Sequence, residues 1–254
     1  IEVLEPVSIR DNACIEKLRG LNPDFMAVVA YGRILPPAIL DLPTKGCVNL
    51  HASLLPKYRG AAPINWAIVN NEKVTGVTTM LMDKGMDTGP MLLKEEVGIG
   101  EDETAEELAK KLSNAGASLL AKTIDLLSED KIKPAPQDET EASYAPMLKK
   151  EDGRIDWKKS AEEIKNLMRG LYPWPGAYTA LNGQLKIHSG RVIDTNSHEA
   201  EPGTIVGVSR EGIRVACGKG VFEITELQPE NRKKLPAGDF IQGYRVGVGE
   251  RFDG

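Results

Sequence analysis

Two polar side chains in one short segment could act together in acid–base chemistry. Strand geometry over residues 47–51 would put Asn49 and His51 on the same face, near the end of the strand. Open parallel sheets bind ligands beyond the carboxyl ends of their strands, and residues 52–56 begin the loop that follows. A histidine can move a proton or stabilise an oxyanion, and an amide can donate to the same oxygen. The other interpretation is that His51 is an ordinary strand histidine whose ring is satisfied by a carbonyl.

A second segment, residues 82–90, holds two carboxylates in a glycine-rich turn. The carboxylate of Asp83 or Asp87 could orient the imidazole of His51, or the segment could be a plain turn, because Asp and Gly are common turn residues. A histidine, an amide and a carboxylate, with no obvious covalent nucleophile, suit acyl transfer to an amine.

Two clusters of basic residues are weaker candidates for binding sites. Residues 57–60 (KYRG) could be an anion-binding loop or a solvated one. A basic run could contact phosphates or form a solvated surface, and it consists of Arg232, Lys233 and Lys234. The chain contains no GxGxxG, P-loop or GxSxG motif, so the dinucleotide-binding, NTPase and serine-hydrolase classes lack support.

The cysteines and histidines bear on metal binding and on location. Three of each are scattered at no usual zinc spacing, so we expect no metal. An odd number of widely spaced cysteines fits a reducing compartment, and no apolar run is long enough to cross a bilayer. We therefore expect a soluble, cytoplasmic protein.

The first half of the chain alternates strand and helix patterns. Residues 25–30 form a continuous apolar run typical of a strand buried on both faces of a parallel sheet. Residues 47–51 and 77–82 are further strand candidates, with a helix predicted over 63–71 between them. A capping box at Thr104 and Glu107 begins a long amphipathic helix. This order predicts an α/β fold with a Rossmann-like, mostly parallel sheet.

The second half has a different pattern. Residues 131–147 contain three prolines and no apolar periodicity, which indicates a linker. A capping box at Ser160 and Glu163 begins a short helix, and only short alternating runs separated by glycines follow. This pattern predicts a small OB-like β-barrel. Residues 1–154 carry 18 Lys and Arg against 24 Asp and Glu, whereas the rest carry 14 against 13, so the negative charge lies in the first half.

Two sequence segments together carry a family resemblance. NLHASLLPKYRGAAPI (residues 49–64) and MDKGMDTGP (residues 82–90) resemble the signature of enzymes that use 10-formyltetrahydrofolate as a formyl donor. The resemblance implies 10-formyltetrahydrofolate as co-substrate and catalytic roles for Asn49, His51 and Asp87. It also implies a folate site formed by two segments: Arg33, Ile34 and Leu35, and Ser53, Leu54, Leu55 and Pro56.

The C-terminal half of the chain narrows the choice of acceptor substrate. Residues 155–178 are similar to a segment shared by family branches that act on methionyl-tRNA, on sugar nucleotides or in folate oxidation. Residues 224–252 look like the end of the branch that formylates initiator methionyl-tRNA, whose small barrel binds the tRNA. The implied activity is formyl transfer to methionyl-tRNA, with residues 232–234 in the tRNA surface. The alternatives are another amine, such as a UDP-amino sugar, or a non-catalytic tRNA-binding module.

The resemblance also implies a domain organisation. We expect a catalytic domain over residues 1–140, a linker over 141–154 and an OB-like tRNA-binding domain over 155–254. The family normally begins with a strand, a glycine-containing turn, a helix, a second strand and a basic loop, none of which precedes Ile1. We therefore expect a catalytic fold that lacks its N-terminal part and either binds folate weakly or self-associates through an exposed sheet edge. We expect the complete enzyme to be a monomer with no membrane attachment.

Overall fold

Two compact units make up the chain in the computed structural model, which describes residues 2–196 and 199–253. The first unit contains the chain up to residue 63, together with residues 74–98 and 109–147. The second contains residues 64–73 and 99–108 and the chain from residue 148 onwards. Two short segments of the predicted catalytic domain thus cluster with the C-terminal half. Within the described ranges, no helix is both long enough and apolar enough to cross a membrane.

The first unit is built on a four-stranded sheet with strand order β1-β2-β4-β5. Its strands are β1 (Met26–Val29), β2 (Cys47–His51), β4 (Val74–Leu81) and β5 (Met91–Gly98). The α/β class is confirmed, but only the β1–β2 pair is parallel, and the β2–β4 and β4–β5 pairs are antiparallel. The chain leaves β2 at His51 and re-enters beside it, with Thr78 paired to His51, so β4 must run in the opposite direction.

The outer strand β1 is less buried than its sequence suggested. Its residues alternate between partly buried and exposed, and the Val29 side chain is 52% exposed. An apolar run therefore does not establish burial on both faces here. Among the described strands, β1 lies at the edge of the sheet, with a neighbour on one side only.

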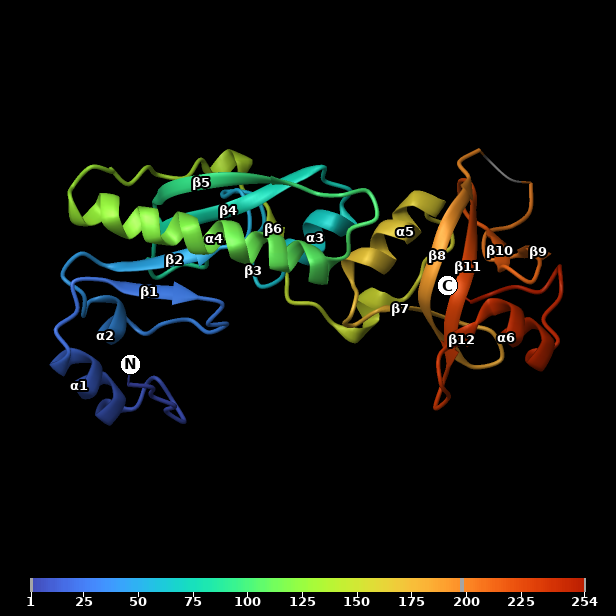
Figure 1. Ribbon diagram of the computed structural model, residues 1–254, viewed down its shortest axis with the longest axis horizontal. Helices are drawn as coiled ribbons and strands as arrows, with labels where there is room; N and C mark the ends of the chain where they lie inside the picture. The colour runs from blue at the N-terminus through green and yellow to red at the C-terminus, as the bar shows by residue number, and fades with distance from the viewer. Residues whose placement is uncertain (1, 197–198, 254) are drawn as a thin grey trace. The chain divides into compact units, whose positions relative to one another are not determined.

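The first helix and the longest helix of the first half each begin at a capping side chain. The helix α1 (Asn12–Gly20) is capped by Asp11, and the other helices are α2 (Pro37–Leu40), α3 (Pro63–Val69) and α4 (Ala105–Ser128). The predicted capping box of α4 is present, with the Glu107 backbone N–H donating to Thr104 Oγ1 at 3.3 Å and the Thr104 N–H donating to Glu107 Oε2 at 2.9 Å. Figure 1 shows α4 running along the sheet. A Cβ at Gly116 would lie 2.6 Å from the Leu50 side chain, so this glycine permits the close approach of α4 to β2.

The predicted linker at residues 131–147 is instead bound along the first unit. Its strand β6 (Tyr144–Ala145) pairs in parallel with β3 (Arg59–Gly60), and Ala135 bridges to Met91. A proline-rich segment can bind in this way because its extended backbone still presents carbonyl and N–H groups between the prolines. We call residues 131–147 the strap.

The second unit contains the helix α5 (Ala161–Gly170), an antiparallel sheet and the helix α6 (Ala237–Tyr244). The sheet order is β7-β8-β11-β10-β9, with β12 beside β11. Its strands are β7 (Ala177–Ala180), β8 (Gln184–Asp194), β9 (Ile205–Val208), β10 (Ile213–Ala216), β11 (Val221–Pro229) and β12 (Leu235–Pro236).

The expected small barrel is an open sheet in the part of the chain that the structure describes. Its ladder ends at β7 and β9, and the C-terminal segment bonds to both regions. The Asp253 N–H donates to the Ala180 carbonyl at 2.9 Å, and the Ile205 N–H donates to the Glu250 carbonyl at 2.8 Å. These bonds cover both outer strands without a continuous strand ladder.

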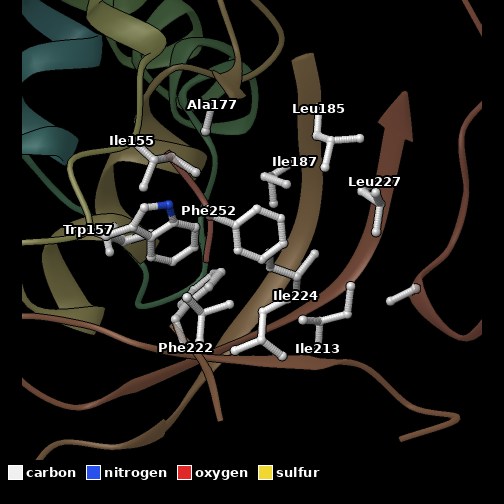
Figure 2. Close-up of a cluster of buried hydrophobic side chains, with 14 of the residues drawn as sticks. Ile155, Trp157, Ala177, Leu185, Ile187, Ile213, Phe222, Ile224, Leu227 and Phe252 are labelled. Atoms are coloured by element: carbon white, nitrogen blue, oxygen red, sulfur yellow. The ribbon is translucent and has the colours of Figure 1, made fainter. Parts of the chain in front are cut away.

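A hydrophobic core packs against this sheet. Figure 2 shows Trp157 and Phe252 side by side, with side chains of β8 and β11 around them. The two rings are stacked with centroids 5.7 Å apart, and the Trp157 indole N–H donates to Thr179 Oγ1 at 3.0 Å. A buried indole is stable here because its apolar rings are packed and its single donor has a partner.

Candidate active site

The structure brings His51 and Asp87 together from different segments of the first unit. The ring atom Nδ1 of His51 lies 3.6 Å from Oδ2 of Asp87, and the two side chains are 7% and 17% exposed. Oδ2 also accepts a hydrogen bond of 2.9 Å from the Gly60 N–H. The distance of 3.6 Å exceeds that of a hydrogen bond, but catalytic contacts of this kind often tighten when substrate binds.

The other ring nitrogen of His51 also has a protein partner. Nε2 lies 2.9 Å from the Tyr58 carbonyl oxygen, so it carries a proton and donates to that oxygen. The carbonyl-satisfied histidine considered from the sequence is therefore real, and it coexists with the Asp87 contact. A proton fixed on Nε2 leaves Nδ1, on the Asp87 side, as the position where the ring can gain or lose a proton.

Asn49 is the third member of the group and the one with an uncommitted donor. It precedes His51 by two residues on β2, so its side chain lies on the same face of the sheet, and it is partly buried. Within residues 2–196 and 199–253, its side-chain amide has no hydrogen-bond partner. It can therefore donate to an oxygen atom of a substrate.

The two carboxylates of the glycine-rich turn have different partners. Asp83 accepts hydrogen bonds from the Thr88 hydroxyl at 2.8 Å and the Gly85 N–H at 2.9 Å, so it stabilises the turn itself. Asp87 has a φ of 55°, in the left-handed region, and its carboxylate is directed at Gly60 and His51. Asp83 thus has the hydrogen bonds of a plain turn residue, whereas Asp87 is the carboxylate that lies beside His51.

The loop after His51 is fastened to the sheet through Thr78. The Thr78 hydroxyl donates to the Ser53 carbonyl at 2.7 Å and accepts from the Leu55 N–H at 3.1 Å. Ser53, Leu55 and Pro56 are buried, and the Ser53 hydroxyl donates to the Lys57 carbonyl at 2.6 Å. Of the four residues of this loop that are predicted to line the folate site, only Leu54 has a partly exposed side chain, because the others pack into the unit.

The second predicted folate segment follows the carboxyl end of β1. Because β1 and β2 are parallel, with Val29 paired to Leu50, this segment starts at the sheet edge where β2 also ends. Arg33 and Ile34 are exposed and line a hollow of about 440 Å³ together with Ser8, Ile9 and Arg10. The Leu35 side chain is buried in a small apolar cluster instead.

Arg59 is placed differently from both sequence interpretations of residues 57–60. Its side chain is fully buried, and its guanidinium pairs with the carboxylate of Glu139 at 2.8 Å and with the Gln137 side-chain oxygen. Hydrogen bonding to Glu139 raises the pKa of Arg59 above its ordinary value. This arginine therefore neither binds an external anion nor faces solvent. Sequence reasoning missed Gln137 entirely, because nothing in the strap distinguishes it locally.

The remaining predicted residues lie in the second unit. Arg232, Lys233 and Lys234 are exposed between β11 and β12, and Lys234 pairs with Glu226 at 2.9 Å. His188 bonds to Gln228 at 2.9 Å, and His198 lies outside the described residues. Across the two described stretches, no three His, Cys, Asp or Glu side chains are grouped so that they could hold a metal ion.

Comparison with known proteins shows which enzymes this chain is similar to. The methionyl-tRNA formyltransferase of Citrifermentans bemidjiense is 53% identical over 250 residues, which cover 98% of this chain and 78% of the relative. The methionyl-tRNA formyltransferase of Geobacter sulfurreducens is 49% identical over 252 residues, which cover 99% and 78%. Among solved structures, HypX from Aquifex aeolicus in complex with tetrahydrofolic acid has a TM-score of 0.68 at 18% identity, over 93% of this chain and 41% of that one. This last likeness shows the fold alone.

Two protein-family models also match in the order of the two halves. The model described as formyl transferase matches residues 2–124, and the model described as formyl transferase, C-terminal domain, matches residues 147–245. The chain therefore belongs to the formyl transferase family.

Proposed function

We propose that this chain transfers a formyl group from 10-formyltetrahydrofolate to the amino group of methionyl-tRNA. The observation that carries the proposal is about 50% identity to methionyl-tRNA formyltransferases, which extends through both halves of the chain. Asn49, His51 and Asp87 supply the groups that acyl transfer to an amine requires. A cytoplasmic location fits an acceptor that is used in translation initiation.

In the proposed reaction, the amine nitrogen of the acceptor attacks the formyl carbon, and the carbonyl electrons move onto oxygen. Asn49, whose amide is uncommitted, donates a hydrogen bond to this oxyanion. The carbon–nitrogen bond to tetrahydrofolate then breaks as the carbonyl re-forms. The proton lost by the amine passes through the His51–Asp87 pair to the departing folate nitrogen.

The position of His51 defines its role in this scheme. Its Nε2 is held by the Tyr58 carbonyl, which fixes the plane of the ring and directs Nδ1 to Asp87. Direct donation from Nε2 to the oxyanion would require this bond to break. The geometry therefore favours Asn49 as the oxyanion donor and His51 as the proton carrier.

The folate donor is proposed to bind at the sheet edge where β1 and β2 end. Arg33 and Ile34 offer exposed side chains beside the 440 Å³ hollow, and Leu54 offers a partly exposed apolar side chain. Ser53, Leu55 and Pro56 would contribute through their backbone or by holding the loop.

The tRNA is proposed to bind mainly to the second unit, because the first half of the chain is acidic. Residues 232–234 are exposed and basic. Arg191 and Arg214 add two further cations, held side by side by the buried carboxylate of Glu223. Replacing Arg232 and Lys233 together by Gln should weaken tRNA binding and reduce its salt dependence without changing the KM for folate.

The mechanism is tested by Asn49→Ala, His51→Ala and Asp87→Asn in formyl transfer from 10-formyltetrahydrofolate to methionyl-tRNA. Each variant should lower kcat by roughly a hundredfold or more. Asp83→Asn is the matched control, because it makes the same change in the same turn without contact to His51. Near-normal turnover in any of the first three variants would remove that residue from the mechanism. A UDP-amino sugar tested beside methionyl-tRNA decides between the two acceptor classes.

A further inference from the structure

We infer that Arg59 and Gln137 are positioning residues, which hold the Asp87 turn against His51. The expected change in kcat rests on the proposed function, whereas the hydrogen bonds that hold the turn do not depend on it. In the part of the chain that the structure describes, neither side chain is hydrogen-bonded to His51. They act through the backbone of the turn.

The first step is the placement of Gln137 by a buried guanidinium. Arg59 donates from Nη1 and Nη2 to the two carboxylate oxygens of Glu139, at 2.9 and 2.8 Å. It donates from Nε and Nη2 to Oε1 of Gln137, at 3.0 and 2.8 Å. A buried guanidinium requires such partners, and its rigid fork fixes the direction from which each partner approaches. The oxygen end of the Gln137 amide is therefore fixed.

The second step follows from the fixed amide. With Oε1 facing Arg59, the nitrogen end of Gln137 faces the turn, where Nε2 donates to the Asp87 carbonyl at 2.7 Å and the Gly89 carbonyl at 2.8 Å. Both amide protons are thus used on the backbone of one turn. Among the described residues, no other side chain donates to these two carbonyls.

The Asp87 turn needs this support because its backbone conformation is unfavourable. Asp87 has a φ of 55°, a conformation that costs an L-residue roughly 1–2 kcal/mol. Its backbone is held by Gln137 on one side, and its carboxylate is held by the Gly60 N–H on the other. Gly60 follows Arg59 directly, so one short strand, β3, supports both ends of the Asp87 residue.

The strap that carries Gln137 is itself anchored beside the site. The Arg59 N–H donates to the Ser143 carbonyl at 2.8 Å, and the Tyr58 N–H donates to the Ser143 hydroxyl at 2.9 Å. The carbonyl of this same Tyr58 accepts from His51. The strap thus reaches the His51–Asp87 pair from two sides without contributing a reacting group.

The test compares Gln137→Met with Gln184→Met in the full chain. Gln137→Met removes both donors to the turn at nearly constant volume, whereas Gln184 is a partly buried glutamine of β8 in the other unit. We expect Gln137→Met to lower kcat about tenfold to a hundredfold, since a shift of about 1 Å in a catalytic group can cost that much. The KM for 10-formyltetrahydrofolate should change little, and Gln184→Met should behave as the parent. The melting temperature of Gln137→Met should fall, because the buried Arg59 loses the acceptor of two of its hydrogen bonds.

Gln137→Glu adds a second, independent variant. It keeps an oxygen for Arg59 but cannot donate to the two turn carbonyls, so it should also lower kcat. Arg59→Lys should act in the same direction, because an ammonium cannot make the four-bond fork.

A readout without turnover separates this inference from the proposed function. In NMR spectra of histidine-labelled protein, the ring signals of His51, assigned with His51→Ala, should move in Gln137→Met at constant pH and stay in place in Gln184→Met. If the parent chain formylates no amine but the His51 signals move, the function fails and the positioning role stands. Unchanged His51 signals, or a kcat within threefold of the parent, would overturn the positioning role.

Discussion

Removal of the Thr78 hydroxyl tests how the loop after His51 is held. Thr78 is fully buried on β4 and is paired with His51 across the sheet. Its hydroxyl donates to the Ser53 carbonyl and accepts from the Leu55 N–H, so it connects two points of the loop to the sheet. Thr78→Val keeps the shape of the side chain and removes both bonds.

The expected magnitude follows from the groups left behind. The Leu55 N–H and the Ser53 carbonyl would lose a buried partner each, and an unsatisfied buried group costs about 1–3 kcal/mol. For the two groups together, we therefore expect the first unit to lose about 2–6 kcal/mol of its free energy of unfolding. Since whole domains are stable by about 5–15 kcal/mol, this loss is measurable. The loosened loop should also raise the KM for 10-formyltetrahydrofolate several-fold.

Urea unfolding can be followed separately in the two units. The chain has three tryptophans, Trp66, Trp157 and Trp174, and all three belong to the second unit. Tryptophan fluorescence therefore reports on the second unit, and far-UV circular dichroism reports on both. Thr78→Val should move the circular-dichroism transition to lower urea and leave the fluorescence transition in place.

Thr75→Val is the matched control. Thr75 lies on the same strand and is 3% exposed, and its hydroxyl has no hydrogen-bond partner in residues 2–196 and 199–253. This variant should change the free energy of unfolding by at most about 0.5 kcal/mol. Equal shifts in the two variants, with an unchanged KM for folate, would refute the claim that Thr78 fastens the loop.

Two further predictions concern the second unit and the helix contacts. Burial raises the pKa of Glu223, but hydrogen bonds from Arg214 and Arg191 outweigh burial and leave its pKa below the ordinary 4.5. A carboxylate with a lowered pKa in the folded state stabilises the fold above about pH 4.5, and this stabilisation is lost as the pH falls through the folded pKa. The fluorescence transition should therefore move to lower urea concentration in acid. Glu223→Gln should abolish this part of the pH dependence. A Cβ at Gly170 would lie 2.7 Å from a side-chain carbon of α3, so Gly170→Ala should destabilise the second unit by about 1–3 kcal/mol in the same assay. Gly20→Ala at the end of α1, with no atom within 4 Å, should be close to neutral, and equal losses in the two alanine variants would contradict the packing argument.

Elements specified by local signals were predictable from the sequence. Residues 47–51 form a strand with the predicted bounds, and the capping boxes at Thr104 and Ser160 begin helices as expected. Caps and alternating patterns involve residues within a few positions of each other, so the sequence displays them directly. The resemblance also named His51 and Asp87, which the structure places 3.6 Å apart.

Features that depend on distant pairs could not be predicted in this way. Arg59 and Gln137 are 78 positions apart, and a lone arginine in a KYRG segment has the same local pattern whether it is buried or solvated. The antiparallel direction of β4 depends on where the chain re-enters the sheet, which periodicity does not encode. The sequence of the strap predicts a linker, because its bonds to β3 and Met91 leave no periodic signature.

The Asp87 turn explains why the candidate site needs a segment that carries no reacting group. The turn contains Gly85 and Gly89, whose conformational freedom makes ordering costly, and its aspartate has a left-handed backbone. The hydrogen bonds within the turn, such as those of Asp83, fix its shape but not its distance from His51. That distance depends on donors outside the turn, from Gly60 and Gln137. Substitutions of Gln137, the strap residue that bonds to the turn, should therefore lower kcat even though no reacting group is changed.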